Sequence, residues 1–148
     1  MANPVFGRTS HRFLVAALSV LALVSFSGAA MASVAVDAIS TNAGDAGSFT
    51  HSHTVGAGSN RLLTVAVSLD FGESVQSVAY GGTPLLQQSA ITNPAGKPRV
   101  ELWRLVDPPT GTADVVVTLN GGSSDKAAIG AISFTGVDQS SPIDDVNA

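Results

Sequence analysis

The stretch Arg61–Leu69, RLLTVAVSL, decides the fold class of this chain. Its side chains alternate along the segment, with Leu63, Val65, Val67 and Leu69 on one side. A period of two places successive side chains on opposite faces of a β-strand, so this stretch predicts a strand with one buried face. The segment 113–119, ADVVVTL, repeats the pattern, because Val115, Val117 and Leu119 fall on one side.

The rest of the chain predicts further strands separated by turns. Segments rich in β-branched, aromatic or small residues are 34–39, 47–55, 75–80, 85–90, 99–106 and 127–134. Glycine, proline and asparagine clusters such as Tyr80-Gly81-Gly82-Thr83-Pro84 lie between them, and such clusters are typical of turns. About eight strands at this spacing, without a helical period, predict an all-β fold: an antiparallel, jelly-roll-like β-sandwich of two packed sheets.

The N-terminus has the pattern of a signal peptide. Arg8, His11 and Arg12 precede the apolar run 13–26, FLVAALSVLALVSF, and Ala30-Met31-Ala32 follows as an A-x-A site. This order predicts cleavage after Ala32, so that residues 1–32 direct export and residues 33–148 form the domain. The alternative is an uncleaved anchor, but a spanning helix needs about 20 apolar residues. We therefore expect a secreted, periplasmic or cell-surface protein with no membrane span in its mature chain.

Composition excludes several function classes. The 148-residue chain has no cysteine, which excludes disulfides, thiolate chemistry and zinc sites made of cysteines. After Ala32 the chain has eleven acidic residues but only five basic ones, Arg61, Lys97, Arg99, Arg104 and Lys126, so its net charge is negative. Such a chain lacks the basic face that neutralises phosphates, so nucleic acid is not an expected partner.

Several ordered blocks resemble a β-sandwich module that recurs in uncharacterised secreted and surface proteins of bacteria and archaea. The blocks are Gly58–Val65 (GSNRLLTV), Val78–Leu85 (VAYGGTPL), Val100–Leu105 (VELWRL), Pro108–Val117 (PPTGTADVVV) and Gly136–Gln139 (GVDQ). The resemblance covers about Val36 to Ile143 and implies an accessory or structural role, with no catalytic residues to transfer. In that family the chain continues past the GVDQ block, whereas this one ends at Ala148, which leaves open a domain incomplete at its C-terminus. A sandwich without its last strands would expose an unpaired edge and an apolar face.

Trp103 and Tyr80 are the candidate ligand-binding residues. An exposed pair of large aromatic side chains could stack on a sugar ring. The alternative is a place in the core, since burial of such a ring contributes a few kcal/mol. Exposure of Trp103 separates the two hypotheses, because the alternation within 100–106 does not decide which face of that strand is inside.

Two groups of residues are candidate metal ligands. Asp138, Asp144 and Asp145, with Asp37 near the other end of the domain, could supply oxygen ligands to calcium, although their spacing matches no dedicated calcium loop. His51 and His53 share one face of a predicted strand, and two imidazoles could bind zinc or copper if further ligands were present. The alternative for both groups is solvation or partial burial without a metal.

No arrangement of residues in the sequence identifies a catalytic reaction. A glycosidase pair from Glu101 with Glu73 or Asp70 has nothing in the sequence to bring it together, and no G-x-S-x-G elbow is present. The sequence therefore predicts no enzyme. It predicts an exported structural, adhesive or accessory module whose partners are other surface or extracellular proteins or a polysaccharide. The alternative is a carbohydrate-binding module that uses exposed aromatics, with calcium as an optional structural ion and no other cofactor.

Overall fold

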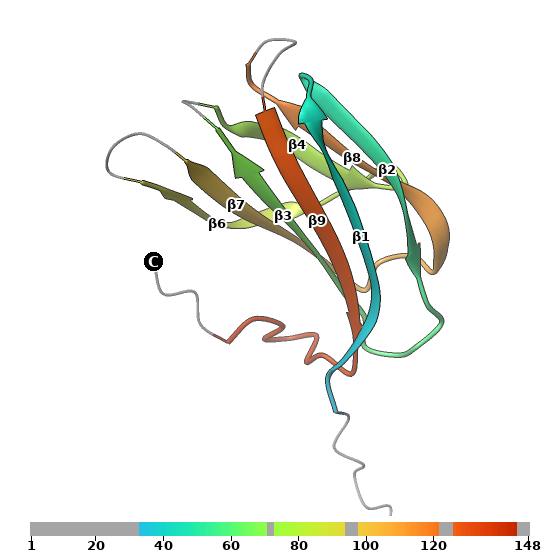
Figure 1. Ribbon diagram of the computed structural model, residues 1–148. Helices are drawn as coiled ribbons and strands as arrows, with labels where there is room; N and C mark the ends of the chain where they lie inside the picture. The colour runs from blue at the N-terminus through green and yellow to red at the C-terminus, as the bar shows by residue number, and fades with distance from the viewer. Residues whose placement is uncertain (1–32, 71–72, 94–97, 122–125, 145–148) are drawn as a thin grey trace, which may run out of the picture. The chain divides into compact units, whose positions relative to one another are not determined.

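The protein is an all-β sandwich of two antiparallel sheets, as the sequence predicts (Figure 1). The computed structural model describes residues 33–70, 73–93, 98–121 and 126–144. The sandwich belongs to the unit Met31–Ala148. Within the described residues, no helix is long and apolar enough to cross a membrane.

One sheet has five strands and the other has four. The five-stranded sheet has the order β1 (Ala35–Asp45), β9 (Lys126–Thr135), β3 (Leu62–Leu69), β7 (Arg99–Val106) and β6 (Leu86–Thr92). The four-stranded sheet has the order β2 (Ser48–Val55), β8 (Gly111–Leu119), β4 (Val75–Tyr80) and β5 (Thr83–Pro84). The chain passes from one sheet to the other between β1 and β2, so these two edge strands face each other along one side of the sandwich.

The core lies between the sheets and uses the faces that alternation in the sequence defines. Leu63, Val65 and Val67 of β3 are fully buried, and so are Val115 and Val117 of β8. Phe49 and Val55 of β2, Val78 of β4 and Ile129 of β9 complete the contact between the sheets. This burial is the main favourable free energy of a domain that has no disulfide.

Strand positions follow the sequence predictions closely, with two differences. β1 continues to Asp45, six residues beyond the predicted end at Ile39, although Ser-Thr-Asn-Ala-Gly-Asp has low strand propensity. Pairing explains the extension, since Ser40 to Asp45 lie opposite Ala131 to Lys126 on β9. The segment predicted as 85–90 forms β6, shifted to Leu86–Thr92, and the predicted turn before it contains the short strand β5. The buried Leu85 separates β5, in one sheet, from β6, in the other.

The tight turn between β4 and β5 has the geometry that its two glycines predict. Gly81 has φ 54° and Gly82 has φ 82°. Both values lie in the left-handed region, where a residue with a Cβ is strained, and they match a type I′ hairpin turn. A Cβ on Gly81 would also lie 3.2 Å from the Cβ of Ala113.

Replacing Gly81 with valine should lower the free energy of unfolding by about 1–3 kcal/mol, because a β-branched residue is forced into a left-handed conformation. Urea denaturation followed by circular dichroism measures this loss. Gly130→Ala is the matched control, since no described atom comes within 4 Å of its Cβ and its φ is not positive. Equal stability of Gly81→Val and the parent protein would contradict the turn assignment.

Candidate functional site

Tyr80 lies in the core and offers no surface to a ligand. Its side chain is fully buried on β4, and its hydroxyl donates a hydrogen bond to the Gly111 carbonyl oxygen at 2.6 Å. The ring meets His53 edge to face, with centroids 6.2 Å apart. Burial raises the pKa of the Tyr80 hydroxyl. Of the two alternatives for Tyr80, surface binding residue or core residue, the structure shows the core residue.

Trp103 is half-buried and turned toward the inside of the sandwich. It lies opposite Val65 in the register of β7 and β3 and packs against the core. Its indole Nε1 donates to Oε2 of Glu101 at 3.2 Å. Trp103 and Tyr80 therefore do not form an exposed aromatic pair on which a sugar could stack.

The side chain that positions Trp103 is Glu101, which is fully buried between the sheets. Its carboxyl group accepts four hydrogen bonds: from Arg99 Nε at 2.6 Å, Gln87 Nε2 at 2.7 Å, Val75 N at 3.1 Å and Trp103 Nε1. These donors come from β6, β7 and the first residue of β4, so the carboxyl group links the two sheets. Because its oxygens are occupied, Glu101 acts here as a structural group.

Replacing Glu101 with alanine should destabilise the fold by about 3–5 kcal/mol, since the change leaves a buried backbone N–H and the Arg99 guanidinium without their acceptor. Urea unfolding measures the loss. Arg104→Gln, an outward-facing change on the same strand, should shift stability by only about 0.5 kcal/mol. A loss below about 1 kcal/mol for Glu101→Ala would show that the network contributes little.

The acidic candidates are not gathered into a cluster. Oδ1 of Asp138 accepts from the backbone N–H groups of Ser141 and Ser140, at 3.1 and 2.7 Å, and these bonds lower the Asp138 pKa. Asp144 is exposed in the C-terminal segment, and Asp145 lies outside the described residues. Asp37 accepts from the Gly56 N–H and the Ser133 hydroxyl, both at 2.7 Å. Among the described residues, no three His, Cys, Asp or Glu side chains are placed to hold a metal ion.

His51 and His53 face inward from β2, as their spacing predicts. His53 is 2% exposed, and its Nδ1 is 2.8 Å from the Ser40 hydroxyl on β1. Both ring nitrogens of His51 and Nε2 of His53 are enclosed without a hydrogen-bond partner in the described structure. Burial lowers the pKa of both imidazoles, and the mutual proximity of the two rings lowers that of His53 further.

The two histidines should make stability depend on pH. Their pKa values are 6.5 in the unfolded chain and lower in the fold, so the unfolded state binds more protons as the pH falls below about 7. The free energy of unfolding should therefore be constant above pH 7.5 and should decrease toward pH 5. Urea unfolding at a series of pH values, with EDTA present, tests this. The decrease should flatten in His53→Gln, and an equally steep decrease in that variant would assign the effect to other groups.

The outer face of the five-stranded sheet is a surface that the sequence did not identify. We call it the aliphatic face. Its exposed bulky side chains are Val36 (58% exposed), Ile39 (65%), Leu86 (70%), Ile91 (50%) and Val100 (45%). Beside Val100 lies a shallow hollow of about 640 Å³, lined by small side chains that include Ala43, Ala66, Ala128 and Gly130.

A segment of the same chain covers one end of the aliphatic face. Val137, Pro142 and Ile143, which follow β9, line an apolar hollow together with Leu62, Leu102 and Phe134 of the sheet. Leu62 points outward on β3 and is nonetheless only 4% exposed. The C-terminal segment runs below β3 and β7 in Figure 1. This end of the face is thus covered by apolar side chains of the segment that follows β9.

The opposite sheet has an outer face of different chemistry. Its strands β2, β8 and β4 present hydroxyl side chains to solvent, at Ser48, Thr50, Ser52, Thr54, Thr112, Thr118 and Ser77. Thr54 and Thr112 share a hydrogen bond of 2.7 Å across the strands. Such a face is stable in water alone, whereas exposed aliphatic side chains side by side are typical of an interaction surface.

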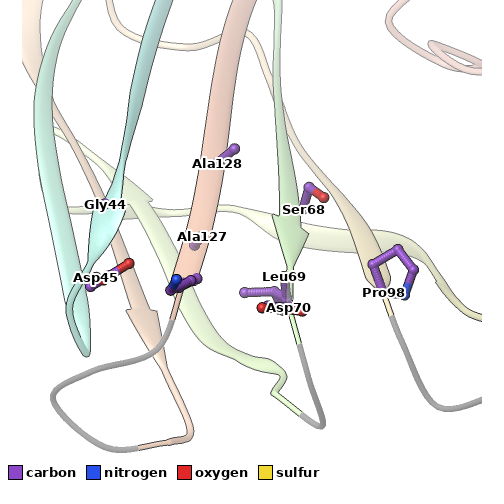
Figure 2. A pocket seen from close by; sticks show the side chains of 9 residues that line it. Gly44, Asp45, Ser68, Leu69, Asp70, Pro98, Ala127 and Ala128 are labelled. Carbon is purple, nitrogen blue, oxygen red and sulfur yellow. The ribbon is translucent and has the colours of Figure 1, made fainter.

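A further hollow of about 430 Å³ lies at the end of the five-stranded sheet (Figure 2). Asp45 at the end of β1 and Asp70 just after β3 lie on either side of the start of β9. The Asp70 N–H donates to the Lys126 carbonyl oxygen at 3.1 Å, which joins the two strand ends. The depression is open, and its two carboxyl groups are accompanied by the Lys126 side chain.

Comparisons of the chain with protein-family models, curated proteins and solved structures found no match.

Proposed function

We propose that the protein is an exported, non-catalytic β-sandwich module with a structural, adhesive or accessory role at the cell surface or outside the cell. In this proposal it docks on another extracellular protein through the aliphatic face. One observation carries the argument: five bulky aliphatic side chains are 45–70% exposed on one sheet, while the other sheet presents hydroxyl groups. Water favours burial of the first surface and leaves the second solvated.

The covered end of the aliphatic face indicates the chemistry of the partner. There, proline, isoleucine and valine side chains of the segment that follows β9 already lie against Leu62, Leu102 and Phe134. The uncovered part has the same kind of surface, with small residues that let another chain approach closely. A protein segment or sheet with aliphatic side chains fits it. A polysaccharide fits less well, because the large aromatic side chains that could stack on a sugar ring are turned inside.

Site-specific labelling can test the docking surface, because the native chain has no cysteine. Single-cysteine variants Val100→Cys and Ile39→Cys report on the aliphatic face, and Thr50→Cys on the hydroxyl face. In the producing cells, a membrane-impermeant maleimide should label positions 100 and 39 several-fold more slowly than in the purified protein. Thr50→Cys should react at the same rate in both settings.

Equal labelling rates at position 100 in cells and in purified protein would contradict docking through the aliphatic face. Slower labelling at all three positions would indicate general burial of the module instead. A second copy of the chain as partner would be recognised because the protection would persist in the purified protein and would decrease on dilution.

Export gives a separate prediction for the N-terminus. Cleavage after Ala32 should leave a mature chain that begins at Ser33, because Ala30 and Ala32 fit the small-residue positions read by signal peptidase. Intact mass and N-terminal sequencing of the protein from the extracytoplasmic fraction measure it. Replacing Ala32 with a bulky residue such as Phe should retain the precursor. A chain recovered from the cytoplasm with Met1 in place would contradict export.

A further inference from the structure

The strongest feature outside the aliphatic face is a pair of imidazoles on the inner face of β2, the edge strand that contacts β1. His51 and His53 lie two residues apart on this strand, so their Cα atoms are about 7 Å from each other. Phe49 and Val55 precede and follow them on the same face, and both are buried. Both ring nitrogens of His51 and Nε2 of His53 are shielded from the solvent that normally satisfies them.

Only one of the two ring nitrogens of His53 has a hydrogen-bond partner. Nδ1 meets the Ser40 hydroxyl at 2.8 Å, which holds the ring in one orientation. When Nδ1 carries the proton and donates it to Ser40, Nε2 keeps a free lone pair, and this atom has no partner in the described structure. Metal-binding histidines show this arrangement, with one ring nitrogen held by an outer hydrogen bond and the other free to coordinate.

His51 adds two more ring nitrogens that are enclosed and without a partner. A buried polar atom without a hydrogen bond is destabilising, so three such atoms on two neighbouring rings favour a further binding partner. Both rings are held in the neutral form by burial, and the neutral imidazole is the form that binds metal ions. Carboxylates lie near each ring, Asp114 for His51 and Asp37 for His53, and they favour a cation there.

We propose that His51 and His53 form a two-imidazole site for a divalent transition-metal ion, which solvent reaches to complete the coordination when the β1–β2 edge opens. Imidazole suits zinc, nickel and copper, and the two nitrogens need to approach to about 3–3.5 Å to share an ion with bonds of about 2 Å. A pair of ligands makes an open site, in agreement with the absence of a three-residue group among the described side chains. The site lies at an edge, since β1 and β2 are the outer strands of their sheets, so limited opening admits an ion.

The first experiment uses the parent protein without an affinity tag. Protein with ¹⁵N-labelled histidine is titrated with Zn²⁺ at pH 7, and long-range ¹H–¹⁵N correlation spectra report each ring nitrogen. His11 is replaced by Gln in any sample that retains it. The expected result is a shift of His53 Nε2 and of one His51 nitrogen that saturates at one ion per chain. Unshifted ring nitrogens in excess Zn²⁺ would overturn the proposal.

Variants then separate a chelating pair from adventitious binding. His51→Gln and His53→Gln should each weaken Zn²⁺ binding, measured by calorimetry, by roughly tenfold or more. Ser52→Ala, which lies between them on the outer face of β2, should bind as the parent does. Equal affinity in the parent and both glutamine variants would also overturn the proposal. Circular dichroism shows whether each glutamine variant folds. If one does not, the Zn²⁺ titration of the parent protein followed by NMR alone tests the proposal.

Discussion

The buried carboxyl group of Glu101 is the constraint on which the arrangement of this sandwich depends. A carboxyl group can lie between two apolar sheets only if hydrogen-bond donors meet it, and here donors from β6, β7 and β4 do so. The bond from Val75 N ties the start of β4, in the four-stranded sheet, to β7 in the five-stranded sheet. The same group holds the Trp103 indole, so the most distinctive aromatic residue is fixed by a polar contact rather than by packing alone.

This constraint also determines the surface. With Glu101, Trp103 and Leu105 turned inward, the alternate residues of β7, Val100, Leu102 and Val106, must face outward. β7 therefore places its more apolar face toward solvent, which reverses the usual rule for a half-buried strand. Together with Ile39 on β1 and Ile91 on β6, this reversal produces the aliphatic face. The hydrogen-bond network of Glu101 and the aliphatic face therefore have the same cause, which is the face of β7 that is turned inward.

Much of the fold was predictable from the sequence, because its main determinants are local. Alternation in 61–69 and 113–119 identifies the two core strands, and the glycine pair at 81–82 identifies the turn. The aliphatic face was not predictable, since alternation in 99–106 defines two faces of the strand but does not show that the face with Glu101 is buried. Pairing with β3 and the donors around Glu101 decide this. The length of β1 likewise depends on its partner β9. The sequence identifies Tyr80 and Trp103 as candidate binding residues, but it does not decide whether their side chains lie in the core or on the surface.

Two of the buried polar groups of the sandwich, Glu101 and the histidine pair, differ in a way that bears on function. The oxygens of Glu101 accept four hydrogen bonds from protein donors, so this group needs nothing from outside the chain. The histidine pair has one protein partner, the Ser40 hydroxyl, for four ring nitrogens, and three of these are enclosed without a partner. A metal ion bound as we propose would give such nitrogens a partner, since neutral imidazoles coordinate metal ions and the carboxylates beside the two rings favour a cation.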